Sequence, residues 1–103
     1  MVTELTGSTF DKFVTDNRIA VIDCWAPWCG PCRRMTPIME ELSKELEKKA
    51  GVAKLNVDEN EAISIRFRIM AIPTLLIFKD GVHIDTLVGL RSKEDLMEYI
   101  GSV

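Results

Sequence analysis

The chain alternates between short apolar runs and stretches in which apolar residues recur every three or four positions. Residues 19–25 are almost continuously apolar, which is typical of a central strand covered on both faces. From residue 31 to about residue 49 the apolar side chains have helical spacing, so we expect a helix there, kinked at Pro37. Met35 and Met39 lie on its apolar face, where we expect them to be core residues.

A shorter helix is expected before the first apolar run. Ser8 to Asp11 resembles a capping box, with aspartate in place of the usual glutamate. The helix that it opens would direct Phe10, Phe13 and Val14 toward the core.

The pattern after the long helix predicts a second strand and another short helix. Gly51 is expected to end the long helix, because glycine is favoured just beyond helix C-termini. Residues 52–57 alternate between apolar and polar, as in a strand. A helix over residues 61–67 follows, with Asn60 as its expected N-cap.

The last third of the chain predicts a hairpin and a final helix. Residues 74–79 and 82–88 are two strand-like runs joined by Asp80-Gly81, a favoured hairpin turn. Residues 92–95 form another capping box, and the helix that it starts would close at Gly101. The order, βαβ and then α-ββ-α, predicts an α/β fold with a central mixed sheet flanked by helices on both faces.

Composition narrows the class of protein. The 103 residues are 47% hydrophobic and 28% charged, as expected of a single domain spanning residues 1–103. A net charge of −3 argues against nucleic acid or an anionic membrane as partner. No apolar stretch reaches membrane-spanning length, and the first residues do not resemble a signal peptide. We therefore expect a monomer in the cytoplasm, a reducing compartment.

Two cysteines carry the chemistry of the chain. Cys29 and Cys32 form a Cys-x-x-Cys motif between a predicted strand and a predicted helix, which indicates reversible dithiol–disulfide exchange. The helix N-terminus would stabilise the Cys29 thiolate, and Pro31 suits the first helical turn. Gly30 would leave the approach to Cys29 open. Cys32, one turn further in, should be more buried and keep its proton longer.

Two other interpretations of this motif are less favourable. A structural disulfide is disfavoured, because so short a loop removes little entropy from the unfolded chain. A zinc or iron–sulfur site needs four ligands, and beyond the pair the chain offers only Cys24 and His83. We therefore expect no metal. In its apolar run Cys24 should pack as a small buried hydrophobe, and His83 should lie on the surface.

The chain resembles the thioredoxin family over nearly its whole length. The segments that carry the resemblance are Asp23, Trp25-Ala26, Trp28–Cys32, Lys54–Asp58, Ile72–Thr74, Phe78, Asp80-Gly81 and Val88-Gly89. The resemblance implies the thioredoxin fold and reduction of disulfide-containing protein substrates, with thioredoxin reductase as electron donor and no cofactor of its own. Cys29 would attack the target disulfide, and Cys32 would resolve the mixed disulfide.

The resemblance also bears on two charged residues. Burial should raise the pKa of Asp23, and the residues alone leave a structural and a functional role equally open. The resemblance favours a proton acceptor for Cys32. Lys54 by itself suggests a lysine at a strand edge with its amine in solvent, whereas the resemblance places it near Asp23.

A target-binding surface is implied as well. The resemblance makes the bond before Pro73 cis and leaves the Ile72 backbone free to pair with an extended peptide. Trp25 is expected in the core and Trp28 at the rim of the site. The residues expected to bind the target are Trp28, Gly30, Pro31, Ala71, Ile72, Pro73, Gly89 and Leu90.

Some positions depart from the family pattern. Cys24 replaces an aromatic residue, Arg68 and Ala71 stand where many relatives have glycine, and Leu90 replaces a smaller residue. Two alternatives stay open: an oxidase or isomerase of the disulfide isomerase type, and a binding module for which redox chemistry is incidental. Gly30-Pro31 argues against the first, because those enzymes usually carry histidine between the cysteines.

Overall fold

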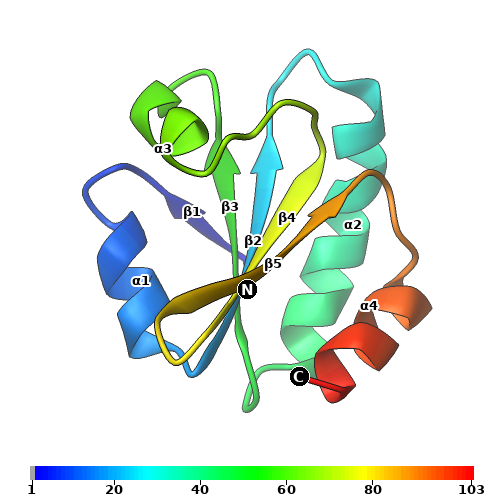
Figure 1. Cartoon of the computed structure of the whole chain (residues 1–103). Coiled ribbons are helices and arrows are strands. Elements are labelled where there is room, and N and C mark those ends of the chain that lie inside the picture. Colours follow the sequence, from blue (N-terminus) through cyan, green and yellow to red (C-terminus); the bar gives the residue numbers. More distant parts are fainter. Residues whose placement is uncertain (1) are drawn as a thin grey trace.

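The computed structural model describes residues 2–103 and contains one five-stranded sheet with four helices (Figure 1). The strands lie in the order β1-β3-β2-β4-β5. The strands are β1 (Thr3–Leu5), β2 (Ile19–Trp25), β3 (Gly51–Asn56), β4 (Thr74–Lys79) and β5 (Val82–Val88), and the helices are α1 (Phe10–Asp16), α2 (Gly30–Glu45), α3 (Glu61–Arg66) and α4 (Lys93–Gly101).

The sheet is mixed, as predicted. Strand β3 pairs in parallel with both β1 and β2, whereas β4 runs antiparallel to β2 and to β5. The predicted hairpin is confirmed, with Asp80 and Gly81 at positive φ in its turn. Its register shifts between Ile77 and Phe78, which marks a β-bulge. Strand β1 was not predicted, because three residues are too few for a periodic pattern to show.

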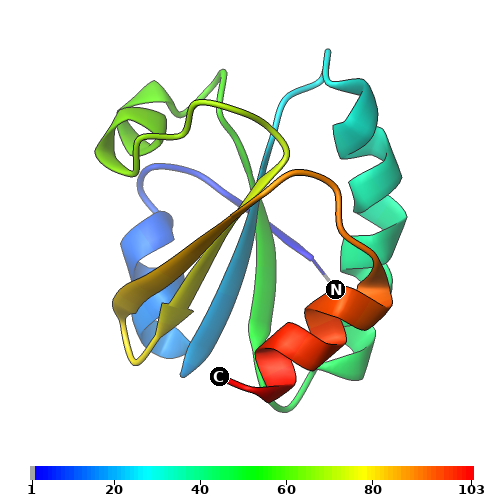
Figure 2. The same cartoon turned by 45° about the vertical axis from the view of Figure 1, so that its right-hand side comes forward.

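The helices cover both faces of the sheet, α1 and α3 on one and α2 and α4 on the other (Figures 1 and 2). Each face has its own apolar core, and β2 supplies alternate residues to the two. Val21 packs in the core under α2 and α4, and Ile22 in the core under α1 and α3. Met35 and Met39 are confirmed as buried residues of the first core.

One predicted cap is wrong, and a second is confirmed in position but makes no capping bond from its side chain. Helix α1 begins at Phe10, and its N-cap Thr9 makes no capping bond from its side chain, so Ser8 heads no capping box. The Thr9 hydroxyl instead accepts from the Thr6 N–H at 2.9 Å. Asn60 is the N-cap of α3 by position, but its side-chain oxygen accepts from Gly7 N at 2.9 Å. A tertiary contact thus takes the place of the local one.

The cap of the last helix is confirmed. The Ser92 hydroxyl accepts a hydrogen bond from the Asp95 N–H at 3.0 Å, and α4 ends at Gly101. The end of α2 differs from the prediction. The helix ends at Glu45, and the N–H of the next residue, Leu46, donates to the Leu42 carbonyl. Gly51 does not end the helix and is instead the first residue of β3.

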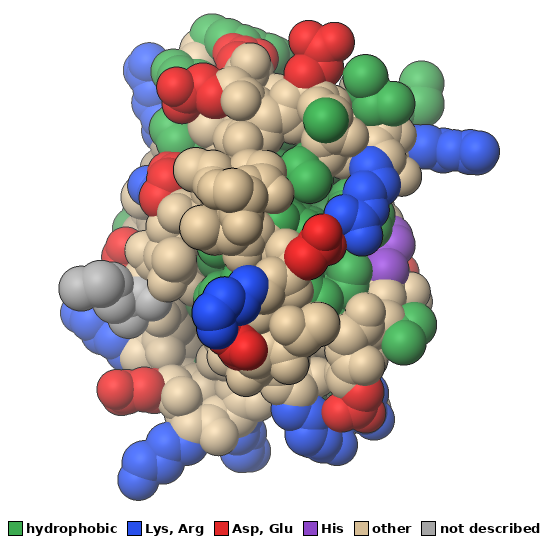
Figure 3. Space-filling view, turned by 90° about the vertical axis from the view of Figure 1, so that its left-hand side faces the viewer, with side chains coloured by type: hydrophobic (Ala, Val, Ile, Leu, Met, Phe, Trp, Pro, Cys, Tyr) green, Lys and Arg blue, Asp and Glu red, His purple; other side chains and the backbone are tan. Residues whose placement is uncertain are grey.

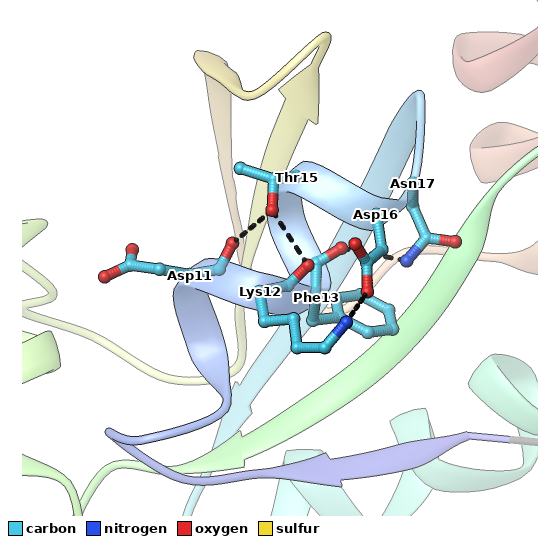
Figure 4. A network of polar contacts seen from close by, with 6 residues as sticks. All are labelled: Asp11, Lys12, Phe13, Thr15, Asp16 and Asn17. Carbon is cyan, nitrogen blue, oxygen red and sulfur yellow. Dashed lines mark hydrogen bonds and ion pairs between the residues drawn. The ribbon is translucent and has the colours of Figure 1, made fainter.

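Helix α1 is held by local polar contacts, which Figure 4 shows. The Lys12 ammonium lies 2.6 Å from the Asp16 carboxylate, one turn further along. The Thr15 hydroxyl donates back to the Asp11 carbonyl at 3.1 Å. Beyond the last turn, the Asn17 amide donates to the Phe13 carbonyl at 2.8 Å, which satisfies one of the unpaired carbonyls at the helix end.

The surface over α1 and α3 carries acidic and basic side chains side by side (Figure 3). Neither sign of charge gathers into a patch on this face (Figure 3). None of the helices in residues 2–103 is long and apolar enough to cross a membrane.

Candidate redox site

The Cys-x-x-Cys motif lies where β2 passes into α2. Cys29 is the N-cap of the helix, with extended backbone, and its Sγ accepts a hydrogen bond from the Cys32 N–H at 3.2 Å. Pro31 occupies the first turn, where its missing N–H costs no hydrogen bond. A side chain at Gly30 would meet no atom within 4 Å, so the approach to the motif is open. In the reduced protein this geometry would place the Cys29 thiolate at the positive end of the helix dipole.

The two cysteines are joined in a disulfide, with their Cα atoms 5.3 Å apart. Cys32 is 2% exposed and Cys29 4%, so both are buried in the oxidised protein. The third cysteine, Cys24, is free and fully buried in the core under α1 and α3. Burial, followed by the charge of Asp23, raises the pKa of the Cys24 thiol. A high pKa makes a thiol unreactive, which agrees with the packing role predicted for it.

Asp23 is a carboxyl group inside the sheet. It is 2% exposed, and its Oδ1 has no hydrogen-bond partner in the part of the chain that the structure describes. Burial raises the pKa of Asp23 to about 7, while the charge of Lys54 opposes this rise and that of Glu4 adds to it. The prediction of a buried carboxyl with a raised pKa is confirmed. The carboxyl is therefore able to accept or donate a proton near neutral pH.

Strand alternation places Asp23 on the same face as α2. Val21, two residues earlier, packs in the core under α2 and α4 together with Met35. Met35 follows Cys32 by three positions, so these two side chains lie on one side of α2. Asp23 and Cys32 thus both belong to the layer between β2 and α2.

Lys54 lies next to Asp23, as the resemblance implied, because the two residues are register partners in β3 and β2. Its ammonium lies 5.2 Å from the centre of the Trp25 ring and 3.8 Å from Glu4 Oε1. Trp25 is only partly buried, so its assignment to the core is wrong. Its indole N–H donates to Glu4 Oε2 at 3.4 Å.

Trp28 is 69% exposed, as expected of a residue at the rim. Its indole N–H donates to Asp58 Oδ2 at 2.8 Å, which fixes the ring. The ring forms one wall of an open pocket that Ala71 and Ile72 also line. The lining residues that sequence reasoning missed are Val57, Ser64, Ile69 and Met70. Met70, at 95% exposure, could have been found only from the position of its loop.

The other predicted binding residues lie around Pro73. The peptide bond between Ile72 and Pro73 is cis, as the resemblance implied. Gly89, at a φ of 97°, donates its N–H to the Pro73 carbonyl at 2.8 Å, which brings the loop after β5 beside this segment. Leu90 follows with 43% of its surface exposed but does not line the Trp28 pocket.

Two further positions clarify the site. Arg68 has a φ of 53°, a left-handed conformation that glycine adopts more readily. This conformation explains why many relatives have glycine at the position. His83 is exposed as predicted, although its ring contacts those of Phe67 and Phe78. Residues 2–103 contain no group of three or more His, Cys, Asp or Glu side chains able to hold a metal ion.

A mixed sheet with a Cys-x-x-Cys disulfide at the N-terminus of the helix after its central strand defines a thiol–disulfide oxidoreductase. Comparison with known proteins agrees with this class. The family model named Thioredoxin matches residues 1–102. With that match, and with the relatives described next, the chain belongs to the thioredoxin family.

The relatives cover nearly the whole chain. The thioredoxin of Rickettsia bellii is 45% identical over 103 residues, which are 99% of this chain and 98% of that protein. The thioredoxin of Staphylococcus saprophyticus is 42% identical over 99 residues, 96% of this chain and 94% of the relative. Among solved structures, the oxidised thioredoxin of Plasmodium falciparum has a TM-score of 0.88 at 33% identity, covering 99% of this chain and 97% of its own. A mutant thioredoxin from Halobacterium salinarum reaches 0.91 at 35% identity, covering 97% of this chain and 88% of its own.

These findings confirm the predicted fold and the predicted class of activity. The protein is a protein-disulfide oxidoreductase whose Cys29 and Cys32 form the disulfide. Proteins of this family are reduced by thioredoxin reductase and act on disulfide substrates.

Proposed function

We propose that the protein works in the reducing direction and transfers two electrons from Cys29 and Cys32 to disulfides of other proteins. The observation that carries this proposal is the position of Cys29, whose sulfur caps α2 and accepts the Cys32 N–H. That hydrogen bond and the helix dipole both favour the thiolate, the form that attacks a disulfide.

The exchange has two steps. The Cys29 thiolate attacks one sulfur of the target disulfide, forms a mixed disulfide and releases the other target sulfur as a thiolate. Cys32 then loses its proton and attacks the Cys29 sulfur, which releases the second target sulfur and leaves the oxidised pair. The target gains two electrons, and the protein loses two.

Asp23 is the proposed acceptor of the Cys32 proton, with Lys54 as the charge that tunes it. Its support is the shared layer between β2 and α2, together with a pKa near 7. Asp23→Asn should slow target reduction more than it changes the reduction potential. Equal rates for the variant and the wild type between about pH 6 and pH 9 would refute the proton-transfer role.

The proposed target-binding surface combines the Trp28 pocket with the segment around Pro73. Trp28, Ala71 and Ile72 line the pocket, and Gly30 and Pro31, next to Cys29 in the first turn of α2, are proposed to contact the target as well. Gly89 and Leu90 extend the surface past Pro73. The Ile72 backbone would pair with an extended target segment.

The proposal also covers the electron donor and the cellular compartment. We assign re-reduction to a thioredoxin reductase and activity to the cytoplasm. A reducing compartment suits a chain whose third cysteine, Cys24, is free. Purification of the reductase from the same cells, and its kinetics with this protein, would test the first part.

The deciding measurement is the reduction potential of the Cys29–Cys32 pair. A dithiothreitol titration, followed through the fluorescence of the exposed Trp28, would give it. A value near about −270 mV, characteristic of thioredoxins, supports a reductase. A value between about −180 and −120 mV would instead assign an isomerase or oxidase. The double variant Cys29→Ser, Cys32→Ser is the control, and full biological activity without the thiols would favour a binding module.

A further inference from the structure

Three ionisable side chains lie in a row across the sheet. The register pairs Glu4 of β1 with Lys54 of β3, and Lys54 with Asp23 of β2. Alternation places the row on the face that α2 covers, because Val52 and Val21, each two residues before a member of the row, pack in the core under α2 and α4. A lysine therefore stands between two carboxylates on one face.

Glu4 holds the lysine from the side away from Asp23. The Lys54 ammonium lies 3.8 Å from Glu4 Oε1 and 5.2 Å from the centre of the Trp25 ring. The Trp25 indole N–H reaches the second Glu4 oxygen at 3.4 Å. Glu4 is 45% exposed in its side chain and Lys54 32%, whereas Asp23 is buried. The exposed Glu4 carboxylate thus contacts both Lys54 and Trp25.

We propose that Glu4 is a positioning residue: by sharing Lys54 with Asp23, it sets the pH range over which Asp23 exchanges its proton. The proposal deepens the proposed function and rests on it for the consequence in catalysis. Glu4 is not one of the reacting groups, and it acts on Asp23 through its own charge and through Lys54.

Two effects of the Glu4 charge have the same sign. The negative charge disfavours a second anion at Asp23, and it draws the lysine ammonium toward the sheet edge. Both raise the pKa of Asp23 above the value that burial and an unshared Lys54 would set. The partner of Asp23 on β4 is the apolar Leu75, and the charges that act on the carboxyl are those of Lys54 and Glu4.

The test is a titration of Asp23 in the oxidised, full-length protein. The carboxyl carbon is followed by NMR in the wild type, in Glu4→Gln and in Glu47→Gln. Glu47 is an exposed glutamate beyond the far end of α2, so its substitution removes the same charge at a distance. In Glu4→Gln we expect the midpoint of Asp23 to fall by about 0.5 pH unit or more. Glu47→Gln should leave it in place, and Glu4→Asp should restore most of the wild-type value.

Equal midpoints in Glu4→Gln and Glu47→Gln would overturn the proposal, as would a rise in Glu4→Gln. The second readout is the pH profile of insulin disulfide reduction, which should move to lower pH with the NMR midpoint. Asp23→Asn separates the two claims. If that variant keeps the wild-type profile, the proton-transfer role of Asp23 fails, while the NMR titration still decides whether Glu4 sets the titration of Asp23.

Discussion

Asp23 and Cys24 are neighbours on β2, yet they face opposite sides of the sheet and have different chemistry. Both are buried, and burial raises the pKa of each. Cys24 lies among apolar side chains under α1 and α3 and stays inert. Asp23 lies on the face of α2, beside Lys54, and its pKa is brought to about 7. Burial alone therefore does not make a functional group, and the neighbouring charge places the titration in the useful range.

The largest expected effect comes from substituting, one at a time, the reactive Cys32 and the buried Cys24. Cys32→Ser should reduce the rate of insulin reduction to that of the uncatalysed reaction, because the mixed disulfide cannot be resolved without the second thiol. It should also accumulate that mixed disulfide, visible by mass spectrometry. Cys24→Ala should keep most of the activity. A large loss of activity in Cys24→Ala, with the fold intact by circular dichroism, would contradict the separation of the two faces.

The next effect concerns the stability of the oxidised protein. The folded-state pKa of Asp23 is raised from 3.8 to about 7, so the stability contributed by its proton is present below about pH 4 and lost as the pH rises through 7. The wild type should lose about 4 kcal/mol of unfolding free energy between about pH 4 and pH 8 through this group.

Asp23→Asn has no such proton to lose. Relative to the wild type it should gain about 4 kcal/mol at pH 8 over its difference at pH 4. Denaturant unfolding of the oxidised proteins at both pH values would measure this. A constant difference between the two proteins would show that Asp23 titrates at its ordinary pKa in the fold.

A pair of core leucines sharpens the comparison between the faces. Leu75 packs under α2 and α4, and Leu76 packs under α1 and α3, both fully buried. Each substitution to alanine should cost about 2–5 kcal/mol of stability. Only Leu75→Ala should also lower the pKa of Asp23, because Leu75 is its register partner and a cavity there reduces its desolvation. Denaturant unfolding and NMR titration give the two quantities, and equal changes in pKa would refute the distinction.

The smallest effect separates a real cap from an apparent one. Ser92 accepts the Asp95 N–H at the start of α4, so Ser92→Ala should cost about 1 kcal/mol. Ser8 bonds only to the Thr6 hydroxyl and caps nothing, so Ser8→Ala should change stability by less than about 0.5 kcal/mol. Thermal and denaturant unfolding would compare them. A similar cost for both would restore the capping box at Ser8.

The sequence predicted the elements whose signals are local and repeated. Strand β2 and the hairpin strands have the predicted bounds, because their apolar runs and the Asp80-Gly81 turn leave little choice. The expected capping bonds are absent where the side chain has another partner, local for Ser8 and distant for Asn60. Asn60 accepts from Gly7, 53 residues away, and no local pattern reports such a contact.

The site was predictable to the extent that its residues form a motif. Cys29 and Cys32 follow from spacing, and Asp23 from a charge within an apolar run. Glu4 was missed because its strand is three residues long and its role depends on a register across three strands. Met70 was missed because nothing in a loop sequence indicates which pocket the loop borders.

The two outer strands of the sheet have a consequence for self-association. A free strand edge presents unpaired backbone groups that another chain can copy, which is how ordered aggregates grow. Here one edge is the short β1, and the other is β5, whose pairing with β4 is broken by a bulge after Ile77. Both are poor templates for a further strand. Strand β5 therefore exposes apolar side chains on an edge that resists fibrillar stacking. These side chains are Val82, Ile84 and Val88.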